Sequence, residues 1–195
     1  MQIQYYYAMA MDLIGSRNYP IEKRIKLQQL LAALIGVMNA SGRVLMMDFS
    51  RGDEIEGLFE TNYDAMFALK LMKSALWRVN VRFGIGAGEW TIKMNGNVNQ
   101  QDGRVFWNMR EAMEMAKTQN HRVHSIGEEM NEASFETFIQ HMDLLPYEEN
   151  SRILSDFLKK AYPDSIDDFN QSVEKLFECR NEYFEQQNQK MGIML

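Results

Sequence analysis

The stretch "YYYAMAMDLIG", residues 5–15, is almost wholly apolar until Asp12. It is short and rich in aromatic residues, which is typical of a strand that is buried on both faces in the middle of a sheet. After Pro20, apolar residues recur at steps of three and four as far as Ser41-Gly42. This spacing predicts an amphipathic helix, so a central strand followed by a helix opens the fold.

Two short apolar runs follow, "RVLMMDF" at 43–49 and "EIEGLFE" at 54–60. The turn residues between them predict a β-hairpin. We expect a second amphipathic helix over 62–77 and a strand over 79–90, where apolar residues alternate along the chain. The order strand, helix, strand, strand, helix, strand predicts an α+β fold with a ferredoxin-like split βαβ sheet and packed helices.

The strand expected over 79–90 carries glycine at positions 84, 86 and 88. A dinucleotide-binding fingerprint needs its glycines at a turn from strand to helix, whereas these fall every second residue within a strand. Their spacing therefore predicts the close approach of another backbone, or of a ligand, to one face of the sheet.

The rest of the chain continues with a third amphipathic helix, a short strand over 122–127 and an acidic helical remainder. The last helix carries an apolar stripe from Ile166 to Phe184. We expect an α+β domain over 1–127 and a helical C-terminal extension over 128–195. The apolar stripe predicts that the extension either packs on the domain or pairs with a second copy in a homodimer.

Composition narrows the class of protein. The chain has 195 residues and a single cysteine, Cys179, which excludes an internal disulfide framework and a multi-cysteine zinc site. No apolar run approaches the roughly 20 residues of a membrane helix, and the N-terminus lacks the pattern of a signal peptide. We therefore expect a cytoplasmic protein that has no membrane partner.

Charge is spread unevenly along the chain. Residues 1–126 hold 15 basic and 12 acidic residues, a net charge of +3, and residues 127–195 hold 6 and 15, a net charge of −9. Binding to a nucleic acid depends on clustered lysine and arginine, so a nucleic-acid partner is not expected.

Two carboxylates mark the most promising site. Asp12 ends the first strand, and Asp53 lies in the hairpin. In a split βαβ sheet these strands are neighbours, so the two carboxylates are expected at one end of the sheet, where they suit a hard divalent ion such as Mg²⁺ with bound phosphates. Gly15 and Ser16 offer backbone amides, and Arg17 a guanidinium, for those phosphates. The alternative is that all five are ordinary turn residues.

Four segments carry a resemblance to a known family: "MDLIGSR", "GDEIEGLF", "VRFGIGAGE" and "DGRVFWNMREAMEMAK". In this order and at this spacing they resemble the SatD family, a bacterial family of poorly defined role, over roughly residues 5–120. The layout is also remotely similar to the catalytic core of class III nucleotide cyclases and GGDEF-type diguanylate cyclases.

The likeness to the cyclase core implies a function for the two carboxylates. It implies that Asp12 and Asp53 hold Mg²⁺ or Mn²⁺ ions against a nucleoside triphosphate. It also implies that the turn of Gly15, Ser16 and Arg17 contacts the phosphates of that nucleotide.

The late helix of the cyclase core supplies transition-state residues, which makes Asn108 and Arg110 the catalytic candidates. They lie only two positions apart, unlike the pair in cyclases, and Phe49 lies near the place of the base-selecting residue. Family members usually carry glycine where this chain has Met11. The fold and metal binding are therefore expected to carry over better than turnover.

Two hypotheses follow. In the first, the protein is a divalent-metal-dependent nucleotide-binding domain, with a degenerate nucleotide cyclase as its catalytic form. In the second, it is a non-enzymatic regulatory or assembly protein that retains the cyclase-like fold. The sequence leaves open whether the protein is an enzyme.

Overall fold

The structure is a computed structural model of the 195-residue chain, and it describes all residues except 1–3, 95, 97, 128–129, 162–164 and 192–195. The strands are β1 (Tyr6–Leu13), β2 (Met46–Arg51), β3 (Glu54–Phe59), β4 (Val81–Gly88) and β5 (Val123–Ile126). The α-helices are α1 (Ile21–Ala40), α2 (Asn62–Ala75), α3 (Arg104–Thr118), α4 (Glu132–Leu144), α5 (Tyr147–Leu158) and α6 (Ile166–Met191). Two short 3₁₀ turns, Ser16–Asn18 and Val98–Gln100, complete these elements.

The strands form one five-stranded sheet in the order β2-β3-β1-β4-β5. All neighbouring strands are antiparallel except β4 and β5, which are parallel. The predicted α+β class and the predicted order of the first six elements are confirmed. The strand expected over 122–127 is present as β5, at one edge of the sheet.

Strand β1 lies in the interior of the sheet, and its side chains alternate between two cores. Met9, Met11 and Leu13 belong to the larger core, together with buried residues of α1 and α2. Ala8 and Ala10 belong to a smaller core formed with α3. The central strand is therefore covered on both faces, as its apolar sequence predicts.

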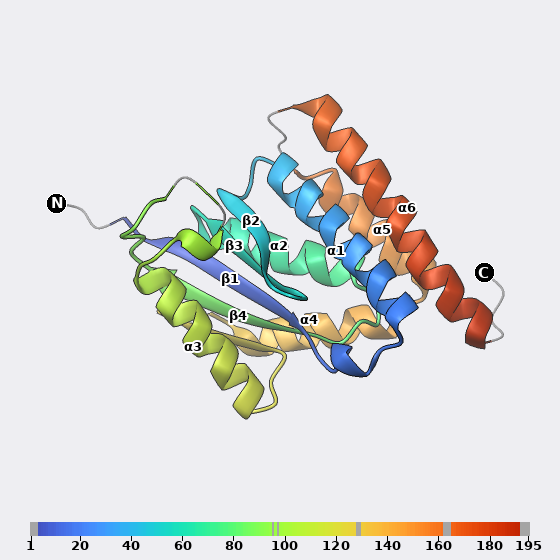
Figure 1. The fold of residues 1–195 in the computed structure, drawn as a ribbon, viewed down its shortest axis with the longest axis horizontal. Coiled ribbons are helices and arrows are strands. Elements are labelled where there is room, and N and C mark those ends of the chain that lie inside the picture. Colours follow the sequence, from blue (N-terminus) through green and yellow to red (C-terminus); the bar gives the residue numbers. More distant parts are fainter. Residues whose placement is uncertain (1–3, 95, 97, 128–129, 162–164, 192–195) are drawn as a thin grey trace.

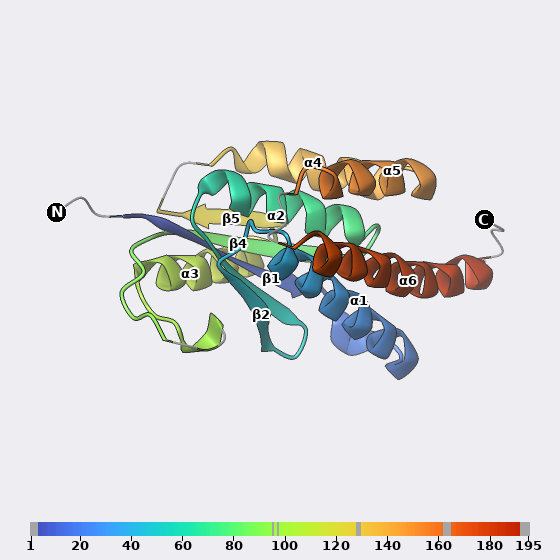
Figure 2. The same ribbon diagram turned by 90° about the horizontal axis from the view of Figure 1, so that it is seen from above.

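The helices are divided unequally between the two faces (Figures 1 and 2). Helices α1 and α2 contact strands from one side, α6 lies along α1, and α5 lies along α2. Helix α3 contacts β1, β4 and β5 from the other side. Helix α3 therefore does not cover the β2–β3 side of that second face, and a polar cavity lies there.

The glycines of β4 explain how α3 comes so close to the sheet. A Cβ atom on Gly84 would lie 2.5 Å from the backbone nitrogen of Met113, and one on Gly86 would overlap the backbone of Met109. Gly88 meets the backbone of Val105 in the same way. The close approach predicted from the glycine spacing is confirmed, and the partner is the backbone of α3.

The C-terminal helices are attached to the sheet domain through buried groups. Phe169, Leu176, Tyr183 and Phe184 of α6 lie in the larger core, whereas Ile166 is 69% exposed. The fully buried Arg180 donates hydrogen bonds to the carbonyl of Ala75 at 3.2 Å, to Ser151 Oγ at 2.8 Å and to Asn150 Oδ1 at 2.6 Å. Burial lowers the pKa of Arg180 to about 10.

Within the described residues, no helix combines the length and the apolar character needed to cross a membrane.

Candidate functional site

Asp12 lies near the end of β1, on the face of the sheet that α3 covers. In the strand register it lies opposite Arg82 of β4. Its neighbour Leu13 belongs to the larger core on the other face of the sheet. Burial raises the pKa of the Asp12 carboxyl, Lys117 lowers it, and the negative charges of Asp53 and Glu54 raise it further. Asp12 is thus a half-buried carboxylate among charges of both signs.

Asp53 lies in the two-residue turn between β2 and β3. Gly52 takes a positive φ of 60°, which favours glycine, and the β2–β3 register shifts between Phe49 and Arg51. The Oδ2 atom of Asp53 is buried and has no hydrogen-bond partner among the described residues. Asp53 lines a small cavity of about 70 Å³ together with Ser16.

The structure brings Asp12 and Asp53 to the same end of the sheet but does not point them at one another. The β1–β3 register pairs Met11 with Ile55. Extended by two positions, this register places Glu54 beside Asp12 and Asp53 beside Leu13. Asp53 itself is a turn residue, and it lines the small cavity with Leu13 and Leu27 of the larger core, on the face opposite to Asp12. Among the described residues, no three His, Cys, Asp or Glu side chains form a metal-binding group.

The predicted phosphate turn follows β1 directly. Gly15 takes the left-handed conformation, with φ 76° and ψ 14°, and Ser16–Asn18 make a single 3₁₀ turn. Ser16 lines the small cavity beside Asp53, whereas Gly15 and Arg17 are exposed. Ser16 and Asp53 are therefore brought together, and Gly15 and Arg17 lie at the surface of the same turn.

The two catalytic candidates in α3 point to different sides of the helix. Asn108 donates a hydrogen bond from Nδ2 to the carbonyl of Ala87 in β4, at 2.8 Å. Arg110, two residues later and about 200° around the helix, lines the cavity beside β2 and β3. The structure therefore separates Asn108 from Arg110, and their catalytic role stays a prediction.

A cavity of about 590 Å³ opens between α3 and the β2–β3 hairpin. Acidic and basic side chains both line it, together with the small side chain of Ala10 and the apolar one of Met113. It is lined by Ala10, Ser50, Arg51, Glu54, Glu56, Asn99, Arg110, Met113, Glu114 and Lys117. Its volume is in the range of small-molecule sites in proteins.

Glu56 is the residue of this cavity that the sequence interpretation missed. It is only 4% exposed, and its Oε2 atom has no hydrogen-bond partner among the described residues. Burial raises the pKa of Glu56, which the positive charge of Arg110 partly offsets. The available signal was a charged residue inside the apolar run "IEGLF", on the face opposite to Ile55.

The basic side chains of the cavity differ in whether they have a partner within the protein. Lys117 pairs with Glu114 at 3.0 Å. Arg51 and Arg110 are exposed, and neither forms a hydrogen bond or an ion pair of less than 4 Å within the part of the chain that the structure describes. Two guanidinium groups are therefore available for an anionic ligand.

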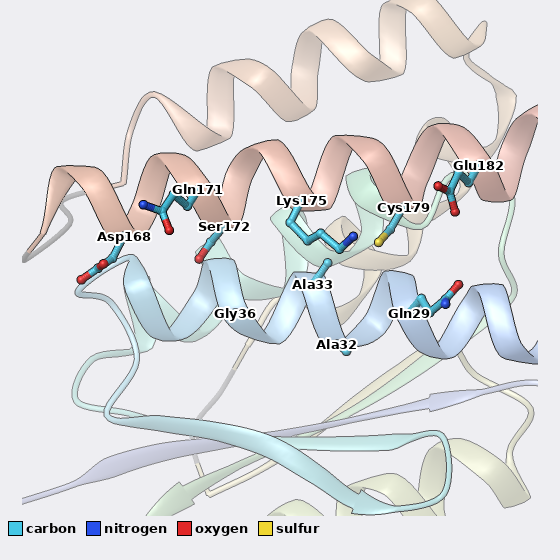
Figure 3. Close-up of a pocket in the computed structure, with 10 residues that line it drawn as sticks. All are labelled: Gln29, Ala32, Ala33, Gly36, Asp168, Gln171, Ser172, Lys175, Cys179 and Glu182. Carbon is cyan, nitrogen blue, oxygen red and sulfur yellow. The ribbon is translucent and has the colours of Figure 1, made fainter.

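A second hollow, of about 690 Å³, lies between α1 and α6 (Figure 3). Small residues line its α1 side, among them Ala33 and Gly36, and Lys175 and Cys179 lie on its α6 side. Burial raises the pKa of the Cys179 thiol, so this side chain is not an activated nucleophile. The groove is a contact between two helices and lacks the buried carboxylate found in the cavity beside α3.

Comparisons with known proteins place the chain in a family. The family model described as SatD family matches residues 6–187, so the chain belongs to the SatD family. No curated protein matches the sequence. A solved structure of a bacterial light-regulated adenylyl cyclase aligns with a TM-score of 0.44 and 11% sequence identity, covering 73% of this chain and 100% of that one. A likeness of this size leaves the site to be judged from this chain's own residues.

Proposed function

We propose that this member of the SatD family binds a nucleoside triphosphate together with a divalent cation, Mg²⁺ or Mn²⁺, at the sheet end that carries Asp12 and Asp53. The observation that carries the proposal is the cavity of about 590 Å³ beside α3, which is lined by cationic and acidic side chains. Neither Asp12 nor Asp53 lines it. Asp12 lies on the same face, where the charges of Lys117 and Glu54 from the cavity lining shift its pKa, and Asp53 lines the smaller cavity on the other face. A nucleotide offers both the negative phosphates and the hydrogen-bonding base that such a mixed lining suits.

The carboxylates at this end of the sheet suit a hard cation. Oxygen ligands from carboxylates are those that Mg²⁺ binds, usually one or two of them together with water and phosphate. The unpartnered buried Oδ2 of Asp53 and the half-buried carboxylate of Asp12 are oxygen atoms of this kind. Because the two side chains lie on opposite faces of the sheet, a cation held by both would lie beyond the end of β1, and the bound cation would neutralise phosphate charge.

Three cations would bind the phosphates. Arg51, Arg110 and Lys117 line the cavity from the hairpin and from α3, and the guanidinium fork of arginine matches phosphate oxygens geometrically. The backbone amides of Gly15 and Ser16, with the exposed Arg17 beside them, would bind the phosphate nearest to the first strand.

Binding without turnover is the form of this function that the site supports best. The side-chain amide of Asn108 is engaged by the Ala87 carbonyl and faces away from the cavity. Arg110 is then the one catalytic candidate that lines the cavity. This observation favours a regulatory protein that senses a nucleotide, over a nucleotide cyclase.

Calorimetric titration tests the proposal. Wild-type protein is titrated with ATP and with GTP, each with Mg²⁺, with Mn²⁺ and with a chelator. We expect binding that requires the cation and that weakens at least about tenfold, equal to about 1.4 kcal/mol, in Asp12→Asn and Asp53→Asn. Asp168→Asn is the matched control, because Asp168 is an exposed aspartate of α6 that lines the groove between α1 and α6. Absence of binding for both nucleotides under every cation condition would overturn the proposal.

A further inference from the structure

Glu56 forms part of the floor of the cavity beside α3. It pairs with Ala10 of β1 on one side and with Asp48 of β2 on the other. The side chain is 4% exposed, and its Oε2 atom lacks a hydrogen-bond partner among the described residues. Leaving a buried carboxylate oxygen without a donor costs free energy. Because Glu56 lines an open cavity, that donor can come from a bound ligand.

We infer that Glu56 is a specificity-determining residue that selects guanine over adenine as the base of the bound nucleotide. The inference rests on the proposed nucleotide site. Guanine presents two adjacent donors, N1–H and the N2 amino group, and a carboxylate accepts both. Adenine presents the N6 amino group beside N1, which is an acceptor, so its lone pair would face a carboxylate oxygen that also carries only lone pairs.

The surroundings of Glu56 fit a flat, uncharged base. Ala10 leaves room above the sheet, and Met113 offers a polarizable apolar wall from α3. Arg110 faces Glu56 from α3. Arg51, Glu54 and the Ser50 hydroxyl, a hydrogen-bond partner of the carboxyl, face it from the hairpin, and Oε2 is the oxygen left without a partner. The base would thus meet the floor of the cavity, while the arginine side chains, which are exposed, would meet the phosphates at its rim.

The position near which the sequence resemblance expects a base-selecting residue does not serve this cavity. Phe49 packs against the larger core, and it is not among the residues that line the cavity. Glu56, which lies seven residues later, carries the only buried carboxylate among the described residues that line it. Among the described residues that line the cavity, Glu56 of β3 is the one with a buried and unpartnered acceptor oxygen.

A charge-to-amide substitution tests the assignment. In Glu56→Gln the amide keeps one acceptor and gains a donor, which matches the N6 donor and N1 acceptor of adenine. Affinities for GTP, ATP and inorganic tripolyphosphate are measured by calorimetry in the presence of Mg²⁺. We expect wild type to prefer GTP over ATP at least about tenfold, and Glu56→Gln to lose or reverse that preference with tripolyphosphate affinity unchanged.

Two comparisons keep the result interpretable. Glu111→Gln removes the same charge from an exposed position of α3 outside the cavity and should keep the wild-type preference. Circular dichroism checks that Glu56→Gln is folded. If wild type binds GTP and ATP equally, or if Glu56→Gln leaves the preference intact, Glu56 does not select the base and the proposed nucleotide site still stands. If neither nucleotide binds wild type, the proposed function and the inference both fail.

Discussion

Gly84 of β4 lies directly beneath Met113 of α3, so that a Cβ atom on the glycine would stand 2.5 Å from the Met113 backbone nitrogen and 2.7 Å from its Cα. Real Cβ atoms do not approach a backbone this closely. Gly84→Ala must therefore lift α3 from the sheet, and we expect a loss of about 3 kcal/mol in the free energy of unfolding. Urea denaturation followed by circular dichroism measures it.

Gly36→Ala is the matched control for that substitution. Gly36 lies within α1, where an added Cβ meets only Ser172 Oγ at 3.8 Å, an ordinary contact. Alanine is the better helix former by about 1 kcal/mol, so this variant should be as stable as wild type or more so. Equal losses in Gly84→Ala and Gly36→Ala would contradict the close packing of α3 on β4.

Arg180 anchors α6 to the rest of the protein. Its guanidinium donates to Ala75, Ser151 and Asn150, and it lies over the ring of Tyr147 with 4.4 Å to the centroid. Arg180→Ala leaves buried acceptors without donors and opens a void, so we expect a loss of about 3 kcal/mol in the free energy of unfolding. Thermal and urea unfolding are the measurements.

A substitution of an exposed cation of the same helix distinguishes the effect of burial from the effect of charge. Among the described residues, the one ion pair of Lys175 is with Glu178 at the surface of α6, at 3.3 Å. Lys175→Ala should leave the unfolding midpoint unchanged, because an exposed pair one turn apart contributes little. The anchoring role of Arg180 would be wrong if the two substitutions had the same small effect.

Glu56 should make stability depend on pH. Burial raises its pKa above the ordinary value of 4.5, against the lowering by Arg110. The folded protein then binds the proton more tightly than the unfolded chain, so stability falls as pH rises from 4.5 through the raised pKa and stays lower above it. Below pH 4.5 Glu56 is protonated in both the folded and the unfolded protein, so it no longer makes stability depend on pH.

Glu56→Gln removes this titration. Its free energy of unfolding, measured by urea denaturation from about pH 4 to about pH 8, should change less with pH than that of wild type. As the pH rises through the raised pKa, the free energy of unfolding of Glu56→Gln should increase relative to that of wild type. A difference between the two proteins that is constant across this range would argue against a buried, ionising Glu56.

Arg110 and Arg104 provide a matched pair for phosphate binding. Both are exposed arginines of α3, but only Arg110 lines the cavity. Arg110→Ala should weaken the binding of a nucleoside triphosphate about tenfold or more, equal to about 1.4 kcal/mol, whereas Arg104→Ala should not. Calorimetric titration at two salt concentrations measures both; equal weakening would indicate only a general effect of net charge.

Much of the fold could be predicted from local patterns. The apolar run that ends at Asp12 gave a central strand, because a strand covered on both faces has no polar side. The glycines at 84 and 86 indicated a close backbone contact, which is a property of those residues themselves. The hairpin around Gly52 was equally local, since turn residues mark it.

The candidate site depended on relations that the sequence does not contain. The sequence indicated that Asp12 and Asp53 lie at one end of the sheet, but the folded hairpin turn places Asp53 beside Leu13 and Leu27, on the face opposite to Asp12. In the sequence, Glu56 is one charged residue within an apolar strand. In the structure, α3 packs on the neighbouring strands and not on β3, and Glu56 therefore lines a cavity.

The sequence by itself determined the order of the elements, the buried central strand and the glycine face that receives α3, because these follow from the periodicity of neighbouring residues. Only the tertiary structure decided which charged groups share a cavity, since Glu56, Arg51 and Arg110 lie on different elements that meet through strand register and helix packing. The site is therefore a property of packing, to which each local pattern contributes one side chain.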